Sequence, residues 1–549
     1  MEPKMLPQIV LDYVESVIQK MKYSRKVRQD VRAELLAHFE DALRNISDET
    51  DKQKKAEALI RDFGDAKVLA VLIRRGKKRC RPVWQKAVFA VLKVVGIIFA
   101  ICLLRIGYMA AGRPVISVDY SQWMNEKVRA DRAESLNAYY DYQKAVESLS
   151  KKLPADIEKI LKYARNQEKT PADWEAIENF LKTESKAIEM LRQGASKPYY
   201  WNKYKSPGTN LKIGEFAARV VKELMPQSSG YRKIAQRIAI LQIPLETHQG
   251  NIEQAVNDSI ALYRFGQHIL SQGVPIEQLV GTALKSLAMG SIKDLLGRAE
   301  LSAEELLGLQ QIIEADFDPN TAFMDWSLEK AFWYEEIQRS FTSDGQGNGR
   351  PLLRGIPFAV KDTTDAIKGF VSGFPNRKEV IQLIDNAFNR YDELRKITPY
   401  TLHLKKERVF WDNSDTLFFM QIEGPAVQKT IEISWRTRAE QAGVITTLSV
   451  LRFQKENGRL PESLNELREK GYLLKMPMDP YSDKSLVYRK TEDGFILYSV
   501  GSNFTDDGGI PSTNNKGQKF QFGEHGDWVF WPVQKEPAKV LPSTTPGKN

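Results

Sequence analysis

Few residues of this 549-residue chain have types and spacings that could do chemistry. The sequence contains no His-Glu-x-x-His, Gly-x-Ser-x-Gly or Cys-x-x-Cys motif, the patterns typical of metalloproteases, serine hydrolases and thiol redox or zinc sites. The two histidines closest in sequence are twenty residues apart, a spacing that gives no metal-ligand geometry. A serine triad assembled from residues distant in the sequence remains an alternative. The histidines are scattered along the chain: His38, His248, His268, His403 and His525.

The glycine cluster at 345–349, Gly-Gln-Gly-Asn-Gly, invites comparison with a phosphate-binding loop. That motif needs a hydrophobic strand before it and Gly-Lys-Ser/Thr after it, and both are missing here. The cluster therefore predicts a flexible loop. Because no catalytic set of residues is legible, we expect that the protein is not an enzyme, with an envelope hydrolase of unrecognised site as one alternative.

The most informative stretch is the apolar run from Ala87 to Ala111. At about 1.5 Å per residue it forms a helix of about 37 Å, enough for a hydrocarbon core of about 30 Å. Its two charges, Lys93 and Arg105, lie within about two turns of an end and can reach opposite membrane surfaces. They are roughly 120° apart around the helix, whereas a helix lying on the membrane gathers its charges on one face. The run predicts a transmembrane helix at 87–111, and a surface helix or a buried core helix is the alternative.

The flanks of this run predict its orientation. Residues 74–86 contain seven Lys and Arg and no acidic residue, so the segment 76–86 is a basic juxtamembrane flank. The positive-inside rule then places the N-terminus in the cytoplasm and the large C-terminal part in the periplasm, across a bacterial inner membrane. The run begins too far along the chain for a cleaved signal peptide, so we expect an uncleaved anchor. The net charge of +10 owes much to this flank and does not indicate nucleic-acid binding.

Cysteine usage constrains the part after the anchor. The two cysteines are Cys80, in the basic flank, and Cys102, inside the apolar run. Residues 112–549 contain none, which argues against a small disulfide scaffold and against thiolate zinc sites there.

Residues 1–75 predict a cytoplasmic bundle of three or four helices. Apolar residues recur at helical spacing, and Gly64 can end one helix while Asp65 caps the next. The run 31–39, Val-Arg-Ala-Glu-Leu-Leu-Ala-His-Phe, followed by Ala-Glu-Ala at 56–58 and Phe-Gly-Asp at 63–65, resembles the permease-prefix or HAAS-type helical domain. That resemblance implies a regulatory or protein-contact module in front of a membrane segment.

Residues 112–440 predict a large helical ectodomain. Small and aromatic residues alternate at helical spacing in 136–146 and again in 250–265, and each segment looks like half of a tetratricopeptide unit. No 34-residue period is sustained, so an irregular helical bundle stands beside a true repeat solenoid. The expected fold is mostly α, with a small α+β module at the C-terminal end.

Residues 441–535 form that module. A helix is expected to end at Asn457-Gly458, a short helix to include Pro461, and strands at 486–489 and 495–500 to form a hairpin. The ordered set Phe453, 457–461, Asp479-Pro480, Tyr488, 498–501 and the acidic loop 503–509 resembles the globular end of type II secretion pseudopilins. With the aromatic run at 527–532, the whole arrangement also looks like uncharacterised membrane-anchored proteins of planctomycete-type bacteria. Residues 536–549 are predicted to be a disordered tail.

The pseudopilin resemblance implies one metal site. In the major pseudopilin the loop that corresponds to 503–509 holds calcium, so Asp506 and Asp507, with backbone carbonyls and Asn503, are the candidate ligands here. The alternative is an Asp-Gly turn without a metal. The chain departs from the pseudopilin pattern because about 330 residues separate its anchor from the module, which argues against assembly into a pilus.

These observations favour a single-pass, membrane-anchored envelope scaffold or protein-interaction protein, with an association with secretion machinery as one option. The first alternative is a transmembrane signalling or regulatory protein whose cytoplasmic head binds a regulator. The expected partners are the membrane, through residues 87–111, and proteins whose identity the sequence does not indicate.

Overall fold

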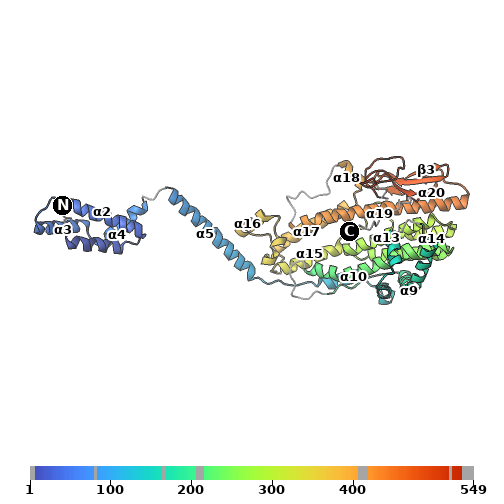
Figure 1. Cartoon of the computed structure of the whole chain (residues 1–549), viewed down its shortest axis with the longest axis horizontal. Coiled ribbons are helices and arrows are strands. Elements are labelled where there is room, and N and C mark those ends of the chain that lie inside the picture. Colours follow the sequence, from blue (N-terminus) through green and yellow to red (C-terminus); the bar gives the residue numbers. More distant parts are fainter. Residues whose placement is uncertain are drawn as a thin grey trace, which may run out of the picture. The chain divides into compact units, whose positions relative to one another are not determined.

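The computed structural model describes residues 6–79, 83–163, 168–205, 215–405, 418–517 and 522–533 (Figure 1). This described part is mostly helical and has one two-stranded and one three-stranded sheet, which confirms the expected fold class in outline. It divides into two compact units, residues 1–104 and 105–549. The predicted disordered tail at 536–549 and Cys80 lie outside the described residues.

The first unit is a four-helix bundle with its own core, as the sequence indicates. Helix α3 ends at Gly64, which has φ +76° and donates its N–H to the carbonyls of Ile60 and Arg61. Asp65 caps the next helix by accepting the N–H groups of Lys67 and Val68. The four helices are α1 (Gln8–Lys20), α2 (Arg25–Leu43), α3 (Glu49–Phe63) and α4 (Ala66–Arg79), and their core includes Val10, Val14, Val17, Val31, Leu35, Phe39 and Ala56.

Helix α5 (Val83–Ala110) belongs to the first unit up to Leu104 and to the second from Arg105. The helices of the second unit are α6 (Tyr120–Arg129), α7 (Tyr139–Glu147), α8 (Ala155–Tyr163), α9 (Pro171–Ser196), α10 (Glu215–Arg237), α11 (Ile243–His248), α12 (Ile252–Leu270), α13 (Pro275–Leu296), α14 (Ala303–Glu314), α15 (Ser327–Ser340), α16 (Thr363–Ser372), α17 (Arg377–Leu394), α18 (Pro399–Lys405), α19 (Phe418–Asn457) and α20 (Leu464–Glu469). Short helical turns stand at η1 (Glu134–Leu136), η2 (Ile238–Gln242) and η3 (Leu353–Phe358). The tetratricopeptide-like arrangement stays a prediction, because these helices range from six to forty residues.

Helix α19 is the central helix of the second unit and lies between the helical layers and the strands (Figure 1). Residues 437–450 are buried on every side of the helix although several are polar. Their hydroxyl groups are satisfied within the helix: Thr446, Thr447 and Ser449 each donate to the carbonyl four residues earlier, at 2.7–2.8 Å. The helix runs without a break across position 440/441, so the helical region and the C-terminal module share one core.

The strands of the C-terminal module pack against α19. The predicted hairpin is confirmed, because β3 (Val487–Thr491) pairs antiparallel with β4 (Gly494–Ser499). A third strand, β5 (Trp528–Trp531), pairs with β4 on its other edge. A methyl group on Gly443 of α19 would lie 2.3 Å from the Phe530 ring, so this glycine lets β5 approach the helix. The separate two-stranded sheet consists of β1 (Met478–Asp479) and β2 (Lys484–Ser485).

The boundary of one short helix differs from the prediction. Pro461 was expected near the first turn of this helix, but α20 begins at Leu464 after the cap Ser463, which accepts the N–H of Glu466. The Pro461 carbonyl is used elsewhere and accepts the Tyr488 hydroxyl at 2.8 Å. A local capping residue therefore fixes the helix start in place of the proline.

The pair α12–α13 shows where helix backbones come into direct contact. A Cβ on Gly281 would lie 2.3 Å from the Leu270 nitrogen and 2.8 Å from the Gly266 carbonyl oxygen, both backbone atoms. We expect Gly281→Ala to lower the free energy of unfolding by about 1–3 kcal/mol, because the two helices must move apart. The control is Gly308→Ala in α14, where the nearest atom is 3.9 Å away. It should raise stability by about 0.5–1 kcal/mol through helix propensity, and a change of the same sign in both variants in chemical denaturation would contradict the prediction.

Candidate functional site

The apolar helix α5 carries the most distinctive surface of the chain. Its segment Ala87–Ala110 is long and apolar enough to cross a membrane, and the structure buries none of its most apolar stretch. Apolar side chains around the helix are open, including Val91, Phe99 and Leu104, which are 61%, 63% and 75% exposed. Leaving such side chains in water costs about 1.5–3 kcal/mol each relative to burial, so covering this helix with an apolar medium would be favourable.

The C-terminal end of α5 is attached to the second unit. The Arg350 guanidinium donates to the Tyr108 carbonyl at 2.9 Å and lies 3.5 Å from the centre of the Tyr108 ring. Gly112 follows the helix and fits closely, since a Cβ there would lie 2.5 Å from Leu352. The end of the apolar helix is therefore held by two interactions of one arginine and by close packing of the following turn.

The acidic loop after β4 brings the predicted residues Asp506, Asp507 and Asn503 together. The Asp506 carboxylate accepts the Tyr498 hydroxyl at 2.8 Å and the Gly508 N–H at 2.9 Å, and it pairs with Arg489 at 3.3 Å. Burial raises the pKa of Asp506, but these hydrogen bonds and Arg489 outweigh burial and hold the pKa below its ordinary value. The Asn503 amide donates to Asp507 at 2.7 Å.

Asp527 is a third carboxylate at this loop, and the sequence reasoning missed it. It is fully buried and accepts the N–H groups of Asp507 at 3.2 Å and Gly509 at 2.6 Å. Burial, with the nearby charges of Asp507 and Asp506, raises its pKa to about 6. The Asp527 carboxylate thus holds the backbone of the loop in place. Because Asp527 lies eighteen and twenty positions after the residues that it binds, no local sequence pattern indicates this role.

The side chains at this loop supply only some of the roughly six to eight oxygen ligands that calcium requires. Within the described ranges, no group of three or more His, Cys, Asp or Glu side chains is placed to hold a metal ion. Calcium at Asp506 and Asp507 would also have to replace the Arg489 guanidinium and the Asn503 amide, which occupy carboxylate oxygens. The calcium site stays a prediction, and the loop is satisfied by its own donors.

If the calcium hypothesis holds, calcium raises the melting temperature of the full chain, and the double variant Asp506→Asn/Asp507→Asn abolishes that rise. Arg489→Gln supplies the sharper test, because it frees an oxygen of Asp506 and should strengthen the calcium effect. Magnesium serves as the control ion, since it prefers a smaller octahedral site. Melting curves that calcium leaves unchanged in both the natural chain and Arg489→Gln would rule out the site.

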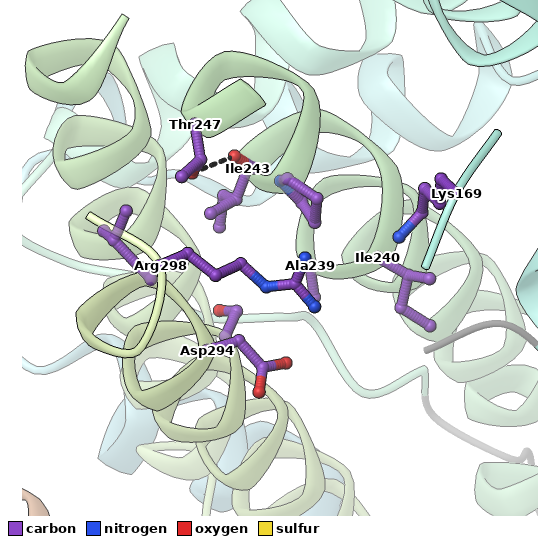
Figure 2. A pocket seen from close by; sticks show the side chains of 10 residues that line it. Lys169, Ala239, Ile240, Ile243, Thr247, Asp294 and Arg298 are labelled. Atoms are coloured by element: carbon purple, nitrogen blue, oxygen red, sulfur yellow. Dashed lines mark hydrogen bonds between the residues drawn. The ribbon is translucent and has the colours of Figure 1, made fainter. Parts of the chain in front are cut away.

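A small pocket lies among α11, α13 and the segment before α9. Figure 2 shows Lys169 and Arg298 extending into it, with Asp294 nearby and the Thr247 hydroxyl donating to the Ile243 carbonyl at 2.7 Å. Burial, with the charge of Arg298, lowers the pKa of Lys169. The cavity volume is about 10 Å³, room for about one water molecule. The pocket as it stands is too small for an organic ligand.

A second cleft of about 360 Å³ lies between the segment around α18 and strand β1. Its volume is within the range of about 300–1,000 Å³ that small-molecule sites occupy. Its charged lining residues are Lys396, Lys405, Asp479 and Asp483, and Asp483 accepts the Thr401 hydroxyl at 2.8 Å. The lining contains neither histidine nor cysteine.

Asp479, part of the pseudopilin-like residue set, has a structural role in that cleft. It is fully buried and accepts the Ser499 hydroxyl at 2.7 Å and the N–H groups of Val500 and Tyr481 at 3.1 Å. Burial raises its pKa, although these hydrogen bonds favour the charged form. The carboxylate ties β1 to the end of β4.

Lys285 is a strongly perturbed cation of the helical core. It is fully buried, pairs with Asp316 and lies 4.3 Å from the centre of the Phe323 ring. Burial lowers its pKa to about 8 despite Asp316. A lysine in this state can act as a base or nucleophile, but Lys285 lines neither pocket described above. Asp316 also accepts the Tyr263 hydroxyl at 3.0 Å and the Gln441 amide at 3.1 Å, so the cluster connects α12, α13 and α19.

Glu277, in the first turn of α13, is another buried titratable group. It is 4% exposed and accepts the Tyr204 hydroxyl at 2.6 Å. Burial raises its pKa to about 7, and hydrogen bonds from Tyr204 and Asn202 only partly oppose that shift. The group is therefore half protonated near neutral pH and makes stability depend on pH.

Comparison of the chain with protein-family models, with curated proteins and with solved structures finds no match. The resemblances to pseudopilins and to permease-prefix domains therefore stay predictions. The described residues themselves supply the basis for any functional proposal, and α5 is their clearest feature.

Proposed function

We propose that the chain is a single-pass protein of the bacterial inner membrane, with its N-terminal unit in the cytoplasm and the part after α5 in the periplasm. The observation that carries this proposal is that α5 is apolar, uncovered and long enough to cross a bilayer. The basic flank at 74–86 supports the orientation. Separate hydrophobic cores before and after the helix support folding on opposite sides of a membrane.

Fusions to alkaline phosphatase, which is active only in the periplasm, test this topology. A fusion after Asp119 should be active, and a fusion after Gly76 should be inactive. Equal activity of the two fusions would overturn the proposal, and so would recovery of the intact chain from cells without detergent.

The role that we propose is that of a non-catalytic envelope scaffold that binds other proteins, with secretion machinery as the first candidate because of the pseudopilin-like residue set. The supporting observation is that buried charged groups hold helices and strands of the second unit together; the pairs are Glu184–Arg237, Lys285–Asp316, Lys293–Glu440 and Asp479–Ser499. Crosslinking of the full chain in native membranes, followed by mass spectrometry, tests this role. Reproducible crosslinks to other envelope proteins are expected, and crosslinks confined to the chain itself would contradict it.

One surface favours a regulatory role for the cytoplasmic head as the second candidate. Helix α4 buries Ala66 and Ala70 but leaves Val68, Val71 and Leu72 exposed at 57%, 42% and 56%. Their spacing of three and four residues gives one apolar stripe, a common signature of a protein contact. Leu72→Asp should abolish crosslinks from the head to a cytoplasmic protein, whereas the control Lys54→Asp in α3 should preserve them.

A further inference from the structure

We propose that helix α16 is an interfacial helix that lies in the outer surface of the lipid bilayer and inserts Ile367 and Val371 into it. This inference rests on the proposed crossing of the membrane by α5. It adds a second membrane contact, far from the anchor in sequence, that would set how the second unit stands on the membrane.

The position of α16 is fixed by the end of the anchor helix. The Arg105 guanidinium donates to the Val371 carbonyl in a long hydrogen bond of 3.5 Å, and a Cβ on Gly373 would lie 3.5 Å from Arg105 Nη1. Arg105 is the charge that ends the uncharged core of α5, so its guanidinium must lie at the interfacial level of the membrane. The C-terminal end of α16 therefore lies at that level too.

The contact also reduces the free-energy cost of holding the charged Arg105 side chain at the membrane. The last carbonyls of a helix have no partner within the helix and carry partial negative charge. Val371 is the next-to-last residue of α16, and its carbonyl meets the positive guanidinium. A charge that otherwise depends on reaching water is thus bound by protein at the membrane surface.

Two apolar side chains are exposed on α16, where a helix that faces water usually carries polar ones. Ile367 and Val371, four residues apart on one face, are 63% and 44% exposed. Gly369 is buried on another side, where a methyl group would lie 2.3 Å from the Phe374 ring. Phe374 in turn packs against a core cluster of the second unit that includes Phe388, so this side of α16 faces the unit while Ile367 and Val371 are open on the other side. Lys368, between the two exposed apolar residues, has a long side chain that can reach the lipid headgroups.

A lipid surface fits this face better than a protein does. A stable protein interface buries about 800 Å² on each partner, far more than two side chains provide. A helix already held at the bilayer by the anchor needs only a small gain in free energy to insert, because its translational freedom has been lost already. A helix of this kind lies in the interface plane with its apolar side about 5–10 Å into the headgroup and acyl boundary.

Spin labels on the full chain test the proposal. With Cys80→Ser and Cys102→Ser as background, single cysteines replace Ile97 in the middle of α5, Ile367 and Val371 in α16, and Leu474, which is 76% exposed in the C-terminal module. Each labelled protein is reconstituted in vesicles of phosphatidylethanolamine and phosphatidylglycerol. The accessibility of the label to oxygen, which partitions into lipid, is then compared with its accessibility to a water-soluble nickel complex.

The labels at 97, 367 and 371 should favour oxygen several-fold over the nickel complex relative to the label at 474. If 97 is in lipid and 367 and 371 resemble 474, the α16 proposal is wrong and the anchor stands. If 367 and 371 are shielded from both reagents, a protein surface covers the face and the proposal is also wrong. If 97 itself is open to the nickel complex, the proposed membrane crossing fails, and this inference with it.

Discussion

Glu184→Leu is expected to lower the free energy of unfolding of the second unit by about 3–5 kcal/mol, the usual cost of removing one partner of a buried ion pair. Glu184 of α9 and Arg237 of α10 form such a pair, and their side chains are 0% and 3% exposed. Glu184 also accepts the Ser150 N–H at 3.0 Å, and Arg237 donates to the Ser150 carbonyl at 3.1 Å. The substitution therefore leaves a buried guanidinium without its counter-charge and a backbone N–H without its acceptor.

A double-mutant cycle separates the pair from its surroundings. Arg237→Met alone should cost a similar amount, whereas Glu184→Leu with Arg237→Met should cost less than either single change, because no unpaired charge remains. The control within the same helix is Glu178→Leu, which removes the exposed pair with Lys182 and should change stability by less than about 0.5 kcal/mol. Guanidinium denaturation of the full chain in detergent measures all four. Additive costs of the two core substitutions would show that the pair does not act as a unit.

The features predicted correctly from the sequence are those that depend on neighbours three or four residues apart. Gly64 and Asp65 end one helix and start the next as expected. The capping box of Ser302 and Glu305 at the start of α14 is equally local, with hydrogen bonds in both directions at 2.7 and 3.2 Å. These interactions form within one helical turn, so residue type and spacing suffice to specify them.

The interactions that hold the second unit together were not predictable in the same way. Lys293 pairs with Glu440 at 2.9 Å although 147 positions separate them, and Arg105 meets Val371 across 266 positions. In the sequence of an amphipathic helix, a buried charged residue cannot be distinguished from a solvent-exposed one unless its ion-pair partner is known. The short helix α16 gave no sequence signal of its role for this reason, because its meaning comes from the end of α5.

The C-terminal module shows both cases in one region. The hairpin was predictable because short runs of apolar and aromatic residues, at 486–488 and 495–498, flank a Glu-Asp-Gly turn. Strand β5 was not, because Trp528–Trp531 becomes a strand only by pairing with β4. Asp527, one residue before β5, arrives at the acidic loop through that same pairing, so the missing strand and the missing site residue have one cause.

Glu277→Gln should remove a large part of the pH dependence of stability. The folded pKa of about 7 is raised from an ordinary value of 4.5, so the folded state holds the proton over a range in which the unfolded state releases it. Stability from this group is fully present below about pH 4.5 and declines as pH rises to about 7, by about 3 kcal/mol in total. The variant lacks the titrating carboxyl, and its amide oxygen can still accept the Tyr204 hydroxyl.

The measurement is the difference in unfolding free energy between the natural chain and the variant at pH 4.5, 6 and 8, in detergent and at constant ionic strength. The variant should gain relative to the natural chain as pH rises, with most of the change complete by pH 8. Asp527 and Glu329, whose pKa values burial raises to about 6 and about 7, titrate in the same direction in both proteins and cancel in this difference. Glu304→Gln, at an exposed position of α14, is the control, because it also removes one carboxyl group. Its unfolding free energy should depend on pH in the same way as that of the natural chain. If Glu277→Gln also runs parallel, Glu277 is ionised in the folded protein at neutral pH, and water must reach the carboxylate that the structure buries against Tyr204.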